Sequence, residues 1–286
     1  MTRNTGPDWA AARSEKWRRH LAGLEAMLRP IDEPLVAALA LTGPTRIADV
    51  GCGSGATTME TLRRAPAGSV VHGFDLSPAL VQVARRRRGA QRMQVAFEVA
   101  NMETTAPPER GYDRLVSRLG VMFFADPPAA FANLRRWLAP GGRVAFAVWG
   151  PLDDNAWMAA THAAVADVID LPPLESAEPG PFRYGDAESL VSLLARAGFV
   201  DVTVTDWRQP LAVGGGLRAP DAAAFAVAAF SSFAELLSDA GGDAALRACR
   251  GLTERFAPYE RDGVILMPAR VHIIAGRSAT LGEHRP

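Results

Sequence analysis

The chain has 286 residues, 48% of them hydrophobic, which is enough to bury one large core. Lysine plus arginine and aspartate plus glutamate each number 31, so no excess of positive charge is available to neutralise phosphates or anionic lipids. Nucleic acid and membranes are therefore disfavoured as partners.

Two helices precede the first predicted strand. Apolar residues recur at helical spacing over Trp9–Leu28 and again over Pro34–Leu41. A short β-rich run then ends at Val50, and a cluster of glycines separates it from a helix predicted over Ala56–Arg64. Strand, glycine turn and helix follow one another, which is the unit that builds a parallel sheet.

The alternation of strand and helix continues along the next hundred residues. Strands are predicted over Val70–Phe74, Met93–Ala100, Arg114–Ser117 and Arg143–Trp149, and helices over Pro78–Arg88 and Pro127–Leu138. Such alternation implies right-handed crossovers and a mainly parallel sheet with helices on both faces. We therefore predict an α/β fold whose ligands collect at the carboxyl ends of the strands.

Helices dominate the remainder of the chain. They are predicted over Asn155–Ile169, Ala187–Ala197 and Pro220–Phe256, with strands over Val200–Trp207 and Ala269–Ala275. The two cysteines lie far apart, which fits neither a disulfide framework nor a metal site. The first eight residues are polar, and no apolar run reaches the roughly 18 residues of a membrane span. We therefore expect a soluble, cytoplasmic protein without a bound metal.

The glycine turn is the first candidate binding site. Gly51, Gly53 and Gly55 allow the backbone to turn sharply and approach a ligand, and the following helix presents free N–H groups. Asp75 ends the second strand, where a carboxylate can accept hydrogen bonds from both hydroxyls of a ribose. A nicotinamide cofactor remains a candidate, because Gly51, Gly53 and Ala56 also satisfy one variant of the dinucleotide motif.

The wider set of motifs resembles the class I S-adenosylmethionine-dependent methyltransferases, specifically the small-molecule subgroup that is similar to the ubiquinone and menaquinone biosynthesis enzymes. The resemblance extends over nearly the whole chain. It rests on the segments Asp49–Gly55, Gly73–Ser77, Ala100–Glu103, Tyr112–Phe124 and Leu138–Arg143. It implies a Rossmann-like methyltransferase fold and S-adenosyl-L-methionine as the cofactor.

The resemblance implies a role for each matching residue. Gly51 and Gly53 would lie against the methionine moiety, Asp49 would orient its amino group directly or through water, and Asp75 would bind the ribose. The predicted cofactor-binding residues are Asp49, Gly51, Cys52, Gly53, Gly55, Asp75, Leu76, Asn101, Met102, Glu103 and Ser117.

The adenine end of this set contains one departure from the family pattern. Leu76 and Met102 would flank the adenine ring. The family usually has aspartate at the position of Asn101, where it accepts a hydrogen bond from the adenine amino group. The amide oxygen of asparagine can also accept one, so we expect adenine binding without a negative charge at that edge.

Methyl transfer is an in-line displacement from a sulfonium, so alignment and exclusion of water matter most, and a base is needed only where the acceptor holds a proton. We therefore name no catalytic residue. By resemblance, the acceptor wall comes from the N-terminal helices, the segment after the fourth strand and the late helices. Its predicted residues are Trp17, Arg118, Met122, Phe123, Trp149 and Trp157. These side chains favour a small hydrophobic or aromatic acceptor, and aromatic faces also stabilise a sulfonium.

Two assignments stay open at this point. His20 and His162 are either general-base candidates or ordinary residues of surface helices. Arg118 pairs either with an acidic acceptor or with Asp113 or Glu103.

The sequence therefore predicts a cytoplasmic methyltransferase of secondary metabolism that acts on a small-molecule acceptor as a monomer or homodimer. One alternative is an NAD(P)-dependent oxidoreductase, which needs a proton-relay pair such as Tyr-Lys, although Lys16 is the sole lysine. The other is a non-catalytic cofactor-binding scaffold. The predicted domains are an N-terminal helical cover (1–43), a Rossmann-like core (44–210), a helical insertion that caps the acceptor (211–268), and a final strand and tail (269–286).

Overall fold

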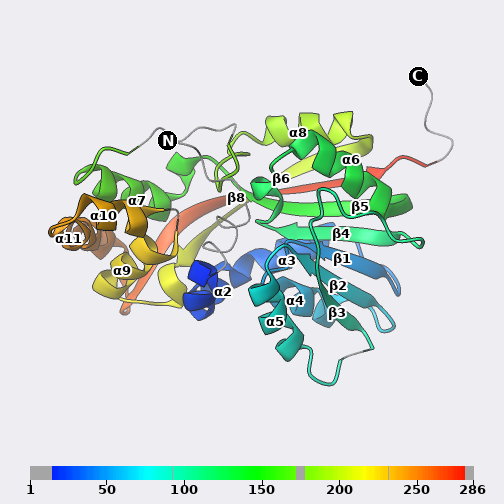
Figure 1. Ribbon diagram of the computed structural model, residues 1–286, viewed down its shortest axis with the longest axis horizontal. Coiled ribbons are helices and arrows are strands. Elements are labelled where there is room, and N and C mark those ends of the chain that lie inside the picture. The colour runs from blue at the N-terminus through cyan, green and yellow to red at the C-terminus, as the bar shows by residue number, and fades with distance from the viewer. Residues whose placement is uncertain (1–14, 92, 172–177, 231, 281–286) are drawn as a thin grey trace.

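The computed structural model describes residues 15–91, 93–171, 178–230 and 232–280 (Figure 1). In this part of the chain the sheet has the strand order β3-β2-β1-β4-β5-β8-β6, and the short β7 pairs with β8 outside this path. The strands are β1 (Arg46–Val50), β2 (Val70–Asp75), β3 (Val95–Val99), β4 (Tyr112–Arg118), β5 (Leu138–Trp149), β6 (Phe199–Ala212), β7 (Glu260–Arg261) and β8 (Val264–Ser278).

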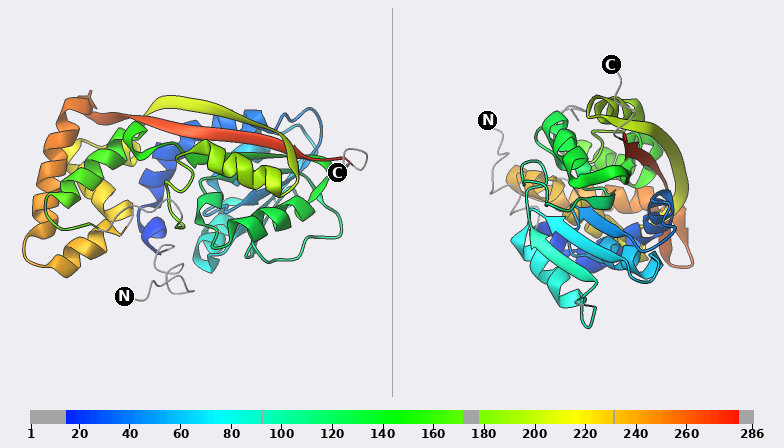
Figure 2. Two further views of the ribbon diagram at one scale, coloured as in Figure 1. Left: turned by 90° about the horizontal axis from the view of Figure 1, so that it is seen from above. Right: turned by 90° about the vertical axis from the view of Figure 1, so that its right-hand side faces the viewer.

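Helices cover both faces of the sheet (Figures 1 and 2). The helices that precede β3 in the chain form the first group: α2 (Leu21–Leu28), α3 (Asp32–Ala38), α4 (Ala56–Arg64) and α5 (Pro78–Arg87). Two helices that follow β4, α6 (Pro127–Trp137) and α8 (Ala187–Arg196), form the second group. The third group is α7 (Ala156–Ala166), α9 (Ala219–Ala229), α10 (Phe233–Ala240) and α11 (Ala244–Phe256). Single 3₁₀ turns are η1 (Arg29–Ile31), η2 (Val121–Phe123), η3 (Leu152–Asp154), η4 (Val213–Gly215) and η5 (Ala257–Tyr259).

The strand directions decide where ligands can bind. Strands β1 to β5 are mutually parallel, whereas β8 runs antiparallel to both of its neighbours, β5 and β6. The carboxyl ends of β1, β2, β3 and β4 therefore meet at one edge of the sheet. The predicted α/β architecture, a mainly parallel sheet with helices on both faces, is confirmed.

Helix starts follow from local capping chemistry. The Ser77 hydroxyl accepts a hydrogen bond from the Leu80 N–H at 3.2 Å, and Pro78 begins α5. Asp126 does the same for the Ala129 N–H at 3.0 Å, with Pro127 as the first residue of α6. A side-chain acceptor before a proline satisfies one free N–H group and presets the helical backbone. Both helix starts lie where the sequence predicts them.

Strands β6 and β8 are longer than their sequence patterns suggest. They pair from Phe199 with Ser278 to Ala212 with Leu266, so their hydrogen bonds continue well beyond the predicted ranges. The reason is non-local, because each strand gains its extra length from the other. The predicted boundaries at 210/211 and 268/269 fall inside these two strands.

The third group of helices gathers at the far end of the β6–β8 ribbon, away from the parallel strands (Figures 1 and 2). Here α11 packs against α9 and α7, and α2 lies between this group and the sheet, where it contacts η4. Among the described residues, no single helix is long and apolar enough to cross a membrane, although α9 and α10 meet the length and composition test together as a sharply bent pair.

Candidate cofactor and acceptor site

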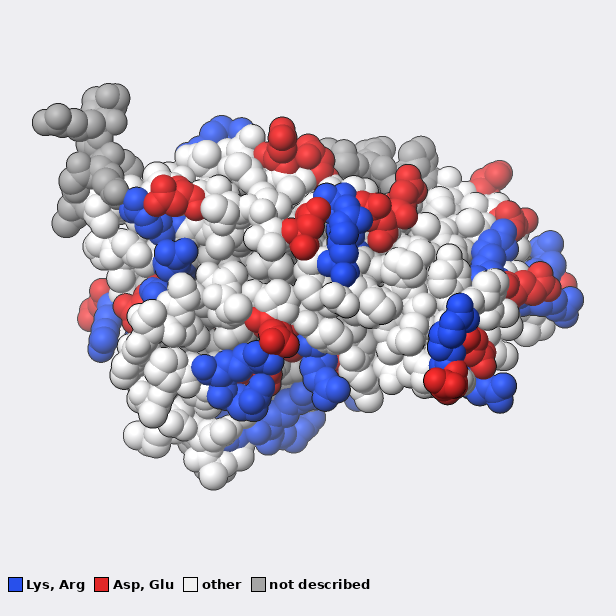
Figure 3. Space-filling model, turned by 180° about the vertical axis from the view of Figure 1, so that it is seen from behind, with Lys and Arg blue, Asp and Glu red and all other residues white. Residues whose placement is uncertain are grey.

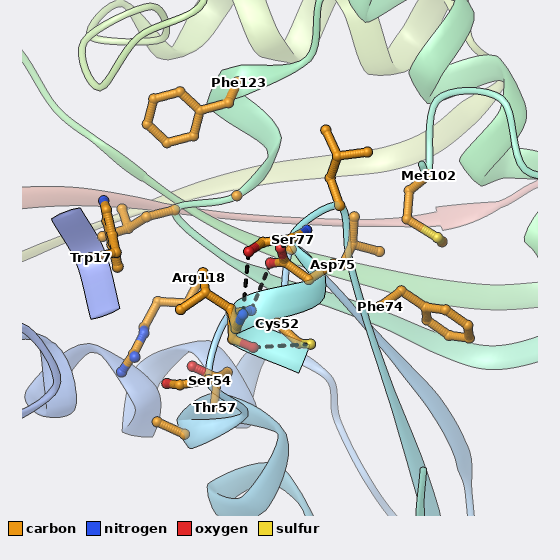
Figure 4. Close-up of a pocket in the computed structure, with 18 of the residues that line it drawn as sticks. Trp17, Cys52, Ser54, Thr57, Phe74, Asp75, Ser77, Met102, Arg118 and Phe123 are labelled. Carbon is orange, nitrogen blue, oxygen red and sulfur yellow. Dashed lines mark hydrogen bonds between the residues drawn. The ribbon is translucent and has the colours of Figure 1, made fainter. Parts of the chain in front are cut away.

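A cavity of about 220 Å³ lies at the carboxyl edge of the parallel strands (Figure 4). It joins residues from the glycine turn, the ends of β2 and β4, the turn after β3, and the N-terminal helices. The predicted residues that line it are Gly51, Cys52, Gly53, Asp75, Leu76, Asn101, Met102 and Glu103 from the cofactor set, and Trp17, Arg118 and Phe123 from the acceptor set.

The glycines of the turn serve two different purposes. Gly53 has a φ of +54°, and a Cβ placed on it would meet no protein atom within 4 Å. Because Gly53 lines the cavity, that Cβ would occupy ligand space instead. Gly55 has a φ of +84°, but its Cβ would lie 2.7 Å from a ring carbon of Phe97. Gly53 therefore leaves room for a ligand, whereas Gly55 leaves room for packing behind the cavity.

Asp75 is held in one orientation by two backbone groups. Its carboxylate accepts hydrogen bonds from the Gly53 N–H and the Ser77 N–H, both at 2.8 Å (Figure 4). Burial raises the pKa of this carboxyl group, while the two N–H donors oppose the rise. A carboxylate has about four acceptor positions, so those that remain are available to a ligand in the cavity.

Asp49 lies behind the glycine turn and does not line the cavity. Its side chain is 0% exposed. Oδ2 accepts a hydrogen bond from the Thr58 hydroxyl at 2.6 Å, whereas Oδ1 has no hydrogen-bond partner in the part of the chain that the structure describes. Burial raises the pKa of Asp49 to about 7. A buried carboxylate oxygen that lacks a donor suits a ligand amino group, reached directly or through water, as the resemblance implies.

The turn after β3 is fixed by side chains on both sides. The Asn101 Oδ1 accepts a hydrogen bond from the Glu103 N–H at 3.0 Å, and Asn133 of α6 donates to the carbonyls of Met102 (3.0 Å) and Thr105 (2.9 Å). Met102 is buried, whereas Leu76, on the other side of the predicted adenine position, is 55% exposed. The Asn101 oxygen is thus already engaged once, and it retains a second lone pair for adenine.

Glu103 also connects two segments of the structure through hydrogen bonds. Its carboxylate accepts hydrogen bonds from the Ala125 N–H at 3.1 Å and the Asp126 N–H at 2.9 Å. Glu103 therefore ties the turn after β3 to the start of α6.

Arg118 has a partner that the sequence analysis did not consider. Its Nη1 donates to Asp32 Oδ2 at 2.8 Å and to the Leu28 carbonyl at 3.3 Å. Asp113 instead accepts a hydrogen bond from the Arg46 N–H, and Glu103 is engaged as described. Of the two alternatives left open for Arg118, pairing with Asp113 or Glu103 is therefore wrong. The reason is that α3, which carries Asp32, packs against β4.

Four other predicted residues lie in the core and not on the cavity. Ser117 is fully buried and donates to the Val50 carbonyl at 2.6 Å. Met122 is also buried. Trp157 is 0% exposed, with its ring centroid 5.5 Å from that of Trp149 and 4.3 Å from that of Phe230. These tryptophans form apolar packing where α7 meets the sheet, so they do not supply the acceptor wall of this cavity.

Several lining residues were missed by the sequence analysis. Glu25 of α2 accepts a hydrogen bond from the Ser54 hydroxyl and pairs with Arg87 of α5 at 2.8 Å, which joins the N-terminal helix to the glycine turn. Glu25 is the only charged residue of α2, and this was a usable signal. The other missed residues include Leu21, Leu28, Ser54, Thr57, Leu119 and Phe124.

The two histidines left open do not line the cavity. The ring of His20 meets Phe225 edge-on at 5.9 Å, and burial lowers the pKa of this histidine. His162 meets Phe233 at 6.2 Å. Both rings therefore pack against the late helices.

Comparisons with known proteins agree with this geometry. A methyltransferase domain family matches residues 47–142. The chain is 31% identical to the demethylmenaquinone methyltransferase of Thermus thermophilus, over 54% of this chain and 74% of that enzyme. It is also 31% identical to the malonyl-[acyl-carrier protein] O-methyltransferase of Halorhodospira halophila, over 55% of this chain and 49% of that one. Among solved structures, the YcgJ protein from Bacillus has a similar fold, with a TM-score of 0.56, 14% identity, and coverage of 87% and 97%.

The strand order and the glycine turn define a Rossmann-like nucleoside-binding protein. The chain belongs to the class I S-adenosylmethionine-dependent methyltransferases, of the small-molecule type. Its cofactor is S-adenosylmethionine, and the predicted enzyme class and cofactor are confirmed. Family membership also removes the nicotinamide-dependent alternative.

Proposed function

We propose that this methyltransferase acts on a small hydrophobic or aromatic acceptor, held in the same cavity as the cofactor. The observation that carries this proposal is the composition of the cavity wall beyond the glycine turn. Trp17 and Leu21 from the N-terminal helices and Leu119, Phe123 and Phe124 after β4 supply mainly apolar surface there. An apolar wall with few polar groups is typical of sites for small organic molecules.

The cofactor residues present in the chain fit S-adenosylmethionine. Gly53 leaves open space beside the turn, the Asp75 carboxylate has acceptor positions left, and Asp49 has one oxygen without a hydrogen-bond partner among the described residues. We assign the ribose to Asp75, the adenine to Leu76 and Met102, and the amino group to Asp49.

The protein's own contribution to the reaction is alignment and dehydration. The bound cofactor supplies an electrophilic methyl group on a sulfonium. Trp17 from the N-terminal region and Phe123 after β4 both line the cavity, and apolar side chains there exclude water from the path between donor and acceptor. The lining carboxylates Glu25, Asp75 and Glu103 are each held in hydrogen bonds to the protein. We therefore assign no general base, and the chemistry best suits an acceptor that is already nucleophilic.

The acceptor's identity does not follow from the relatives, because the names of the two relatives above give different acceptors. The balance of 31 basic and 31 acidic residues supports a small-molecule acceptor over nucleic acid. The face in Figure 3 carries charges of both signs, with one mainly basic cluster on its lower part. We also propose that the enzyme works in the cytoplasm, in secondary metabolism, as a monomer or homodimer.

The first test is calorimetric titration with S-adenosylhomocysteine, and with NADH and NADPH in parallel. We expect binding of S-adenosylhomocysteine alone. A methyl-transfer screen with radiolabelled S-adenosylmethionine against small phenols and hydroquinones, with hydrophilic amines as the contrasting set, then tests the acceptor. Turnover confined to the amines would contradict the proposed acceptor class.

A further inference from the structure

Arg118 is the one basic side chain among the described residues that line the cavity, where it accompanies the carboxylates of Glu25, Asp75 and Glu103. It is the last residue of β4. A cation among apolar groups and carboxylates is the place in this cavity that complements an anionic group of a ligand.

Only some of the N–H donors of the Arg118 guanidinium are hydrogen-bonded to other described residues. Nη1 donates to Asp32 and to the Leu28 carbonyl, whereas Nε and Nη2 have no hydrogen-bond partner among the described residues. Arginine has five N–H donors in one plane, so three of them remain. The Nε and Nη2 groups form the fork that binds a carboxylate through two parallel hydrogen bonds.

Asp32 sets the direction of this fork. It is 3% exposed, and it accepts a further hydrogen bond from the Thr57 hydroxyl at 3.1 Å. The Arg118 side chain is itself only 10% exposed. Two charges removed from water cost free energy that their attraction offsets only with good geometry, so a buried pair beside a cavity indicates a role in ligand positioning.

The position of Arg118 matches one end of the cofactor. Figure 4 shows Arg118 extending toward Ser54 and Thr57, on the side of the glycine turn away from Met102. If the nucleoside lies at Met102 and Asp75, as proposed above, the amino-acid part of the cofactor points to this side. That part carries the cofactor's single carboxylate. We propose that Arg118, positioned by Asp32, binds the α-carboxylate of the cofactor rather than an acidic acceptor.

The proposal rests on the proposed cofactor site, and the test separates the two. Calorimetry compares S-adenosylhomocysteine with its decarboxylated analogue, which keeps the adenosine, the sulfur and the amine. For Arg118→Gln we expect affinity for S-adenosylhomocysteine to fall about tenfold to a hundredfold, as for the loss of a charged hydrogen bond. Affinity for the decarboxylated analogue should change by less than about twofold, because that ligand has no carboxylate for Arg118 to bind.

Three further variants sharpen the comparison. Arg118→Lys keeps the charge without the fork, so its loss should be intermediate. Asp32→Asn should reduce the preference for the carboxylated ligand, because the fork loses its fixed direction. The matched control is Arg114→Gln, which removes an arginine of the same strand that donates to the Leu39 carbonyl and does not line the cavity. It should leave both affinities within about twofold.

Each alternative outcome overturns a defined claim. If Arg118→Gln lowered the affinity for both ligands equally, Arg118 would act through the fold. If both affinities stayed unchanged, the anion that Arg118 binds would not be the carboxylate of the cofactor. If the unmodified enzyme bound neither ligand, the cofactor site itself would be wrong.

Discussion

At the scale of single residues, the site separates into side chains that face the cavity and side chains that hold them. Asp75 and Gly53 face it, whereas Ser117 and Gly55 lie behind it. Mutations in the two groups should therefore differ in what they change first, ligand affinity for the former and stability for the latter.

Asp75→Ala should weaken binding of S-adenosylhomocysteine by about one to two orders of magnitude, because a hydrogen bond to a charged group contributes about 1.5–3 kcal/mol. Isothermal titration calorimetry measures the change. Asp113→Ala is the control, since its carboxylate also accepts a backbone N–H, from Arg46 at 2.8 Å, but does not line the cavity. Unchanged affinity in the Asp75 variant would refute the ribose assignment.

Gly53→Val should abolish cofactor binding, because its side chain would stand in the ligand space. Gly198 is a matched control outside the site, with a φ of +86° and no atom within 4 Å of the position that a Cβ would take. Both valine variants should lose about 1–2 kcal/mol of stability, the cost of a left-handed backbone at a residue with a Cβ. Thermal melts and titrations distinguish the two effects, and retained binding in the Gly53 variant would remove that glycine from the site.

At the scale of elements, α6 holds the turn after β3, the proposed adenine turn, through hydrogen bonds from Asn133. Asn133→Ala removes both hydrogen bonds to that turn, so we expect a stability loss of about 1–3 kcal/mol together with a several-fold loss of affinity for S-adenosylhomocysteine. Asn155 is also a buried asparagine, and it donates to the carbonyls of Gly150 and Pro151, away from the cavity.

Asn155→Ala should therefore lose comparable stability in urea denaturation and keep its affinity. Equal affinity losses in the two variants would mean that α6 does not position the adenine turn in particular.

At the scale of the whole molecule, Asp49 makes stability depend on pH. Burial raises its pKa to about 7, whereas an exposed aspartate titrates near 3.9. Between these values the folded protein binds a proton that the unfolded chain releases, so the free energy of unfolding falls as pH rises and levels off above about pH 7. The contribution is a few kcal/mol, since one pKa unit corresponds to about 1.4 kcal/mol.

Asp49→Asn should lose this component. We expect the stability of the unmodified enzyme relative to the variant to decrease between about pH 4 and pH 7 in urea denaturation, and to change little above that range. Parallel pH profiles for the two proteins would contradict the raised pKa.

The fold as a whole also shows which features could be predicted from the sequence alone. The alternating strands and helices, the glycine turn and Asp75 were predictable because each depends on residues that are neighbours in the chain. In a parallel sheet, those turns then meet at one edge without further information.

Contacts between distant segments were decided only by the tertiary structure. The pairing of Asp32 with Arg118 spans 86 positions and that of Glu25 with Ser54 spans 29, and neither has a local pattern that predicts it. Likewise, the burial of Trp149 and Trp157 depends on which side of α7 faces the sheet. The length of β6 depends on its pairing with β8. Local propensity determines which elements form, whereas the packing of their side chains decides which residues face the cavity and which fill the core.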